Sequence, residues 1–207
     1  MRACHRRSGY LAGLGARYLA GRFGDVAIIG PGAIAAFAVD AIRAVAPIAG
    51  ELRVCGRRLD SAQRFCAQVS SRHGIRTVAH AGPRAAIEGA RLVVTATTHS
   101  GAPFLARDWL ADGTLVIMID RLRVVTRDLL ARASRIVTNS RDSLASWGFR
   151  DQGRACETLP EIVAAGRQQP VGANEITLYD AGGLAVADLA LAALIWRRLN
   201  ERKKGAS

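Results

Sequence analysis

Residues 25–58 read DVAIIGPGAIAAFAVDAIRAVAPIAGELRVCGRR, and this stretch decides the fold. The apolar run 25–29 has the length of a buried strand, and the turn over 30–35 reads G-x-G-x-x-A. Apolar residues then recur at helical spacing, and a second strand is expected over 51–55. Strand, glycine turn, helix and strand in this order are the context that a dinucleotide-binding fingerprint requires.

Each residue type in the turn has a physical role in such a site. Gly30 permits the tight turn, and Gly32 lets a pyrophosphate approach the backbone. Ala33 and Ile34 open the helix, where free N–H groups and the positive end of the helix dipole attract phosphate. The alternative is a glycine-rich packing turn that binds no nucleotide.

The end of the second strand indicates which dinucleotide is bound. An NAD site places an acidic residue there to bind the ribose 2′-hydroxyl. This chain has Gly56, Arg57 and Arg58 instead. Because two guanidinium groups can bind a 2′-phosphate, NADP is expected over NAD, unless both arginines are merely solvated. Asp60, the nearest acid, is expected to cap the following helix.

The rest of the chain alternates between predicted strands and helices, which is typical of an α/β protein with a doubly wound (Rossmann) parallel sheet. Further strands are expected over 75–78, 91–97, 114–120 and 135–138. Helices or helical turns are expected over 61–73, 83–88, 106–110 and 126–133.

Ligands of such sheets bind at the carboxyl ends of the strands. This rule selects Thr95, Ala96 and Thr97 as cofactor contacts, although ordinary strand residues would explain them equally well. Asp120 ends the fifth strand and is the candidate general acid/base, or the partner of a substrate amine. The alternatives for Asp120 are a helix cap and an ion pair with a neighbouring arginine.

Composition argues against several classes of function. The 207 residues carry 29 basic and 17 acidic side chains, but the basic residues are scattered and only 5% of the chain is aromatic. We therefore expect no nucleic-acid interface. Cysteines and histidines, four of each, show no metal-ligand spacing, so we expect no metal site. Unpaired cysteines also fit a reducing compartment, and the cytoplasm is expected.

Both ends of the chain are expected to be helical. The first 24 residues contain no acid and resemble a transit peptide, but a helix from about Ser8 to Gly21 is the competing interpretation. Its apolar side would comprise Leu11, Leu14, Tyr18 and Leu19. Residues 182–196 are nearly all apolar but too short to span a membrane, which indicates a buried packing helix. Residues 197–207 are expected to form a basic, solvated tail.

Four segments resemble the ornithine cyclodeaminase/mu-crystallin family. They are Arg7-Ser8-Gly9 with the helix after it, the glycine turn 29–35, Val94-Thr95-Ala96-Thr97 with Pro103, and 175–189. Together they span nearly the whole chain. The resemblance implies an NAD(P)-dependent oxidoreductase acting on an amino acid or cyclic imine, such as a cyclodeaminase, a ketimine or pyrroline-carboxylate reductase, or an alanine dehydrogenase.

The resemblance also implies roles for single residues. Arg7 would bind the substrate carboxylate, Asp120 would polarise the amine, and Gly183 would contact the cofactor. Family members have a further N-terminal portion with a substrate-facing lysine, so this chain is expected to be a truncated member. Two departures stand out, because 121–125 replaces the family's Pro-Gly-Lys loop and Asp180 replaces a common lysine.

Three regions are expected from this comparison. They are an N-terminal helix over 1–22, a Rossmann domain over 23–174, and a closing strand and helix over 175–207. The first and last would be remnants of a substrate and dimerisation domain, so a homodimer or a partner chain is expected. Two functions stay open. One is an oxidoreductase with a small-molecule substrate, and the other is a catalytically inactive NADP-binding module or a truncated product that lacks the substrate half.

Overall fold

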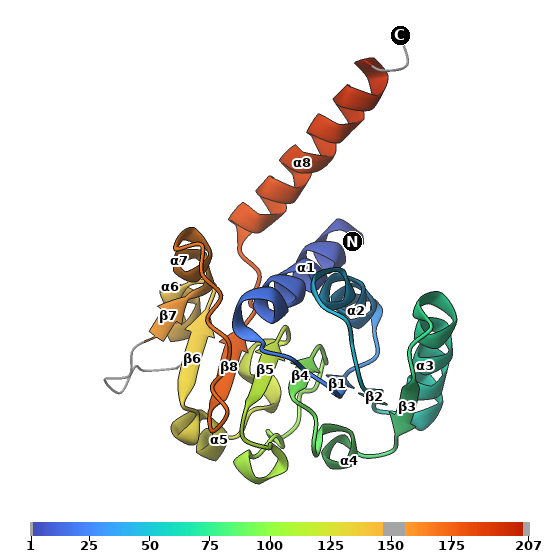
Figure 1. Cartoon of the computed structure of the whole chain (residues 1–207), viewed down its shortest axis with the longest axis vertical. Coiled ribbons are helices and arrows are strands. Elements are labelled where there is room, and N and C mark those ends of the chain that lie inside the picture. The colour runs from blue at the N-terminus through green and yellow to red at the C-terminus, as the bar shows by residue number, and fades with distance from the viewer. Residues whose placement is uncertain (1, 147–155, 205–207) are drawn as a thin grey trace.

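Parallel strands form one sheet in the computed structural model, which describes residues 2–146 and 156–204. The strands are β1 (Val26–Ile29), β2 (Leu52–Cys55), β3 (Thr77–His80), β4 (Leu92–Thr95), β5 (Thr114–Met118), β6 (Arg135–Thr138), β7 (Cys156–Thr158) and β8 (Ile176–Asp180). Their order is β3-β2-β1-β4-β5-β8-β6-β7 (Figure 1). The predicted doubly wound α/β fold is confirmed, and the strand order reverses between β1 and β4.

Helices cover both faces of this sheet. They are α1 (Arg2–Leu19), α2 (Ala33–Val45), α3 (Leu59–His73), α4 (Pro83–Ile87), α5 (Arg127–Arg132), α6 (Arg141–Ser146), α7 (Leu159–Ala164) and α8 (Ala185–Lys204), with 3-10 turns η1 (Arg107–Trp109) and η2 (Arg121–Val124). Val26 and Ile28 of β1 pack into the core beneath α1, α2, α3 and α7. Ala27 and Ile29 point the other way, into the core formed with α4 and α5. Figure 1 shows α1 and α2 opposite α4 and α5.

Small residues bring α1 against α2. A Cβ at Gly9 would lie 2.5 Å from Phe37 Cβ, and one at Gly13 would lie 2.7 Å from Ala41 Cβ. The helical interpretation of the N-terminal stretch is therefore correct, although α1 begins at Arg2 and ends at Leu19. Leu14 was predicted to lie on the apolar side of this helix. That prediction is wrong, because Leu14 is 40% exposed.

The closing strand β8 is an interior strand of the sheet. It pairs with β5 (Leu115 opposite Thr177) and with β6 (Ile136 opposite Leu178). The sequence did not predict this insertion, nor did it predict β7 or α7. The division of the chain at residues 174 and 175 stays a prediction, although β8 shares the sheet with the strands before it.

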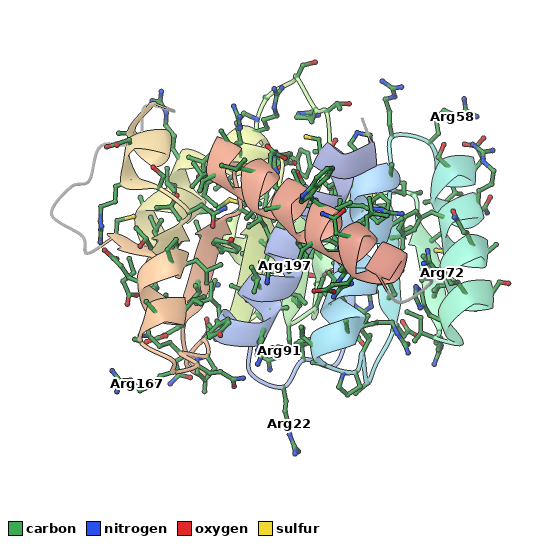
Figure 2. All side chains as sticks on the ribbon, turned by 90° about the horizontal axis from the view of Figure 1, so that it is seen from above. Arg22, Arg58, Arg72, Arg91, Arg167 and Arg197 are labelled. Atoms are coloured by element: carbon green, nitrogen blue, oxygen red, sulfur yellow. The ribbon has the colours of Figure 1, made fainter. Side chains whose placement is uncertain are left out.

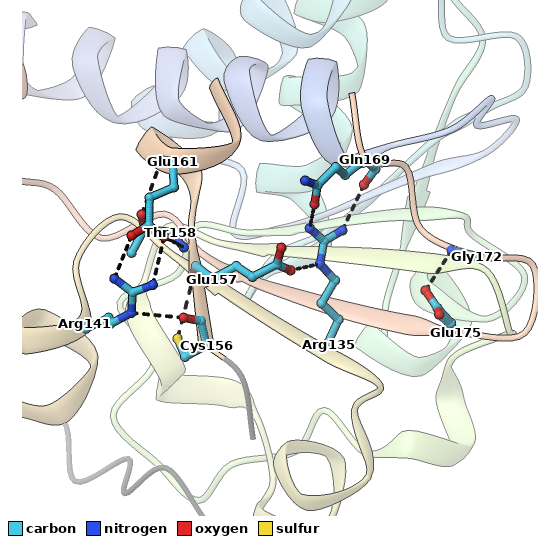
Figure 3. A network of polar contacts seen from close by, with 9 residues as sticks. All are labelled: Arg135, Arg141, Cys156, Glu157, Thr158, Glu161, Gln169, Gly172 and Glu175. Carbon is cyan, nitrogen blue, oxygen red and sulfur yellow. Dashed lines mark hydrogen bonds and ion pairs between the residues drawn. The ribbon is translucent and has the colours of Figure 1, made fainter. Parts of the chain in front are cut away.

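Arginines fasten the edge of the sheet formed by β6 and β7 (Figure 3). Arg135 on β6 binds Glu157 of β7 and the Gln169 carbonyl. Arg141 forms a two-pronged pair with Glu161 of α7, with N–O distances of 2.9 and 2.8 Å. These contacts hold β7 and α7, which are short and bury few side chains of their own.

Figure 2 shows labelled arginines on widely separated segments, in agreement with the scattered basic charge of the sequence.

Helix α8 extends away from the sheet (Figure 1). Its side chains contradict the predicted buried packing helix, because Val186, Leu189 and Trp196 are 65%, 70% and 69% exposed. The predicted solvated end agrees with the exposed side chains at 197–199 and 201, which lie on the continuation of the helix to Lys204, and 205–207 lie outside the described residues. None of the described helices is long and apolar enough to cross a bilayer.

Candidate functional site

The glycine turn joins β1 to α2 and touches the loop after β4. Gly30 has a φ of +96°, and a Cβ there would lie 2.6 Å from the Ala96 carbonyl oxygen. Only glycine adopts this backbone without strain. Because no side chain fits between residue 30 and the Ala96 carbonyl, the turn packs directly against the loop after β4. The turn thus sits at the point where the strand order reverses, which is where doubly wound sheets bind nucleotides.

Gly32 faces open space at the start of α2. Its φ of −109° and ψ of −174° are extended, and apart from its chain neighbours no described residue has an atom within 4 Å of a Cβ built there. The N–H groups of Ala33 and Ile34 donate to no described residue, since the first helical bond runs from Ala36 to Gly32. Open space beside free N–H groups at a helix start fits a pyrophosphate.

The end of β2 lies against this turn. A Cβ at Gly56 would lie 2.8 Å from Pro31 Cγ, so the following arginines are held close to the glycine turn. Arg57 is exposed and forms no ion pair with a described residue, whereas Arg58 donates from Nε to Asp60 Oδ1 at 3.0 Å. The predicted capping role of Asp60 is wrong, because Arg58 holds the N-cap position and the carboxylate of Asp60 binds arginines.

The predicted residues after β4 and β5 converge on one carboxylate. Thr95 Oγ1 donates to Asp120 Oδ1 at 2.6 Å, and the Thr97 N–H donates to Asp120 Oδ2 at 3.2 Å. Asp120 occupies the N-cap position of η2, but its side chain does not cap it. The helix-cap alternative is therefore wrong, and both threonines orient the carboxylate.

Burial raises the pKa of Asp120 to about 6, against the lowering effect of its hydrogen bonds to Thr95 and Thr97. A carboxyl with this pKa exchanges its proton near neutral pH, as a general acid or base must. The pKa also lies far enough from the value of about 3.9 in unfolded chains to affect stability.

We expect Asp120 to make the protein less stable as pH rises. Because the folded state holds this proton more tightly, the stabilisation is fully present below about pH 4 and is lost as pH rises through about 6. The shift corresponds to about 3 kcal/mol. Urea unfolding of wild type and Asp120→Asn between pH 4 and 7 measures it, and the variant should gain stability relative to wild type with rising pH. A constant difference would contradict the assignment.

Arg7 of α1 lies next to α8, where the chain leaves the carboxyl end of β8. Its Nε donates to Asp188 Oδ1 at 3.0 Å and its Nη2 to Asp188 Oδ2 at 3.2 Å. The side chain is only 11% exposed. It crosses Gly183 so closely that a Cβ there would lie 1.7 Å from Nη1. Nη1 has no hydrogen-bond acceptor among the described residues.

A buried group at the ends of β6 and β8 was not predicted. Asn139, Tyr179 and Asp180 lie there, each at most 8% exposed. Asn139 and Asp180 bind the Gly182 peptide, and Tyr179 binds Asn139. Burial raises the pKa of Asp180, and Thr138 Oγ1 donates to its Oδ2 at 3.2 Å. The sequence offered one signal, since Asp180 ends a strand next to two glycines, but its partners come from β6.

A sequence model of the ornithine cyclodeaminase/mu-crystallin family matches residues 3–203. The chain belongs to this family. It is 27% identical to a putative dehydrogenase of Rhizobium meliloti over 87% of this chain and 58% of that protein. It is also 27% identical to an alanine dehydrogenase of Archaeoglobus fulgidus over 97% of this chain and 65% of that protein. The chain thus spans less than two thirds of these relatives.

Solved structures of family members share the fold. The Thermococcus litoralis Δ1-pyrroline-2-carboxylate reductase, solved with NADH and L-proline, superposes with a TM-score of 0.83 at 23% identity, covering 97% of this chain and 66% of that one. An archaeal alanine dehydrogenase dimer with bound NAD gives 0.81 at 22% identity, covering 95% and 64%. The glycine turn, the Asp120 loop and the Arg7 helix therefore lie on a fold that these two structures share.

Proposed function

We propose that the chain is the cofactor-binding part of an NAD(P)-dependent oxidoreductase that acts on an amino acid or a cyclic imine. The observation that carries the proposal is the pairing of two features at the switch point of the sheet. One is the open glycine turn with free N–H groups, and the other is the Asp120 carboxylate held by Thr95 and Thr97. Dehydrogenases and reductases among its relatives support it.

Each residue would act through its own chemistry. The N–H groups at the start of α2 would hold the pyrophosphate, and the bound cofactor supplies or accepts the hydride. Asp120 would pair with the substrate ammonium or iminium and stabilise charge that changes during hydride transfer. Arg7 would present Nη1 to the substrate carboxylate while Asp188 holds its other edge.

The rate of NADH and NADPH oxidation tests this function. It is measured with a panel of cyclic imines, and with keto acids in the presence of ammonia. We expect turnover of at least one carboxylate-bearing imine, such as pyrroline-2-carboxylate. Cofactor binding without any turnover would favour the second candidate, an inactive binding module. The observation behind that candidate is the replacement of the family's Pro-Gly-Lys loop by 121–125.

We propose NADP as the preferred cofactor, because Arg57 and Arg58 follow β2 and no carboxylate remains unpaired there. The Arg57→Ala, Arg58→Ala double substitution should remove a preference of about ten- to a hundredfold, the value of one charge-assisted contact. Since Asp60 engages Arg58, Arg57→Ala alone should remove most of it. Calorimetric titration with NADPH and NADH measures the ratio.

Arg22→Ala is the matched control for that prediction. Arg22 is an exposed arginine that Figure 2 shows away from Arg58, so its loss should not change the ratio. Equal affinity of the unmodified protein for NADPH and NADH would contradict the NADP assignment and leave NAD as the cofactor.

We also propose that α8 is covered by another protein surface, either a second copy or a partner chain, because exposed apolar surface of this kind marks interfaces. Purified protein should elute as an oligomer in chromatography with light scattering. Leu189→Glu, Trp196→Glu should shift it toward the monomer. A monomer at high concentration would contradict the proposal. We propose a cytoplasmic location, which the free thiols of Cys4, Cys55 and Cys66 fit.

A further inference from the structure

A buried chain of hydrogen bonds fixes the backbone between β8 and α8. Tyr179 Oη donates to Asn139 Oδ1 at 2.7 Å, and Asn139 Nδ2 donates to the Gly182 carbonyl at 2.7 Å. The Gly182 N–H donates in turn to Asp180 Oδ1 at 3.2 Å. Both backbone polar groups of Gly182 are therefore held by side chains, and neither can rotate without leaving a buried group unpaired.

This fixed backbone lies on the nicotinamide side of the site. In a doubly wound sheet the 2′-ribose contact after β2 belongs to the adenosine half, so the nicotinamide half lies beyond β1, toward β4 and β5. β8 is the next strand, and its Asp180 is in register with Met118 of β5, two residues before Asp120. Gly182 and Gly183 thus follow the strand next to the proposed acid/base.

Gly183 offers an unused donor at this place. It is only partly buried, and no described residue accepts a hydrogen bond from its N–H. A nicotinamide carboxamide has a carbonyl oxygen that needs a donor, and a donor on a fixed backbone binds with little loss of entropy. The residues that fix this peptide therefore affect only the nicotinamide end of a bound cofactor.

We propose that Asn139 is a positioning residue for the nicotinamide half of the cofactor. By holding Gly182 it directs the Gly183 N–H toward the carboxamide, and Tyr179 sets the orientation of Asn139. The proposal rests on the cofactor assignment of the proposed function. It adds a residue that directly follows β6, far from the glycine turn in sequence, and that orients the backbone at the end of the cofactor where hydride transfer occurs.

Titration of the full chain with NADH and with ADP-ribose, which lacks nicotinamide, tests the proposal. In Asn139→Ala the NADH Kd should rise about two- to tenfold, the usual effect of losing one preordered group, while the ADP-ribose Kd stays constant. Tyr179→Phe keeps the ring and should shift the NADH Kd in the same direction even if Asn139→Ala folds poorly. Thr177→Val is the matched control, because it removes a buried β8 hydroxyl that has no hydrogen-bond partner among the described residues.

Three results would overturn the proposal. The first is an equal loss of NADH and ADP-ribose affinity, which indicates a merely structural role. The second is an unchanged NADH Kd in both variants. The third is a wild type that binds NADH no more tightly than ADP-ribose. Failure of the proposed function has a different signature, namely no turnover in the imine panel while the ratio of the two Kd values still responds to Asn139→Ala.

Discussion

Gly32→Ala should weaken NADH and NADPH binding by about a hundredfold or more, with no loss of folding stability. The added methyl enters the open space at the start of α2, where a pyrophosphate must approach the backbone. Because Gly32 has an extended backbone that alanine adopts freely, the fold loses nothing. A hundredfold change corresponds to about 2.7 kcal/mol of binding free energy. Calorimetric titration and urea unfolding measure the two quantities.

Two other glycines make the comparison decisive. Gly24→Ala also places a methyl in open space, but before β1, and should change neither quantity. Gly30→Ala should destabilise the fold by about 3 kcal/mol or more, because it combines a left-handed backbone with a collision against Ala96. If Gly32→Ala binds cofactor as wild type does, the turn is a packing turn and not a nucleotide site.

Asp120→Asn should reduce any imine reductase activity to about a hundredth or less, and should leave cofactor affinity unchanged. General acid–base groups contribute effects of this size, and the amide can neither carry the negative charge nor exchange a proton. An asparagine can accept from the Thr97 N–H through its oxygen and donate from Nδ2 to Thr95 Oγ1, so the isosteric side chain keeps its place. Initial rates with NADPH at saturating imine measure the loss.

The control for Asp120 is Asp128→Asn. Asp128 forms only an exposed pair with Arg132 on α5, so its substitution should not change the rate. If Asp120→Asn turns over as fast as wild type, Asp120 is a structural carboxylate and another group holds the substrate nitrogen.

Much of the fold was readable from local patterns. The β1–α2–β2 unit follows from an apolar run, a glycine turn and helical spacing within about thirty residues, and β4 and β5 each contain an apolar run of three or four residues. Strand β3 lies two residues later than expected, at Thr77–His80, since its sequence is short and mixed. Resemblance to the family supplied Arg7 and Gly183, which no local pattern would select.

The missed features depend on contacts between distant residues. Asp188 binds Arg7 across 181 positions, and Asn139 binds Tyr179 across 40. Asp60 looked like a helix cap because its position relative to the helix is local information, whereas its arginine partners depend on side-chain geometry. The insertion of β8 between β5 and β6 is likewise a choice of pairing partners that strand periodicity does not contain.

That insertion dictates an order of events when the chain is made. β5 and β6 leave the ribosome well before β8, yet they are not neighbours in the native sheet, because residues 176–180 lie between them. Until that segment emerges, both strands present open edges, which are sites of misassociation. A chaperone that shields strand edges should therefore raise the yield of soluble protein most when translation is slowed between β6 and β8.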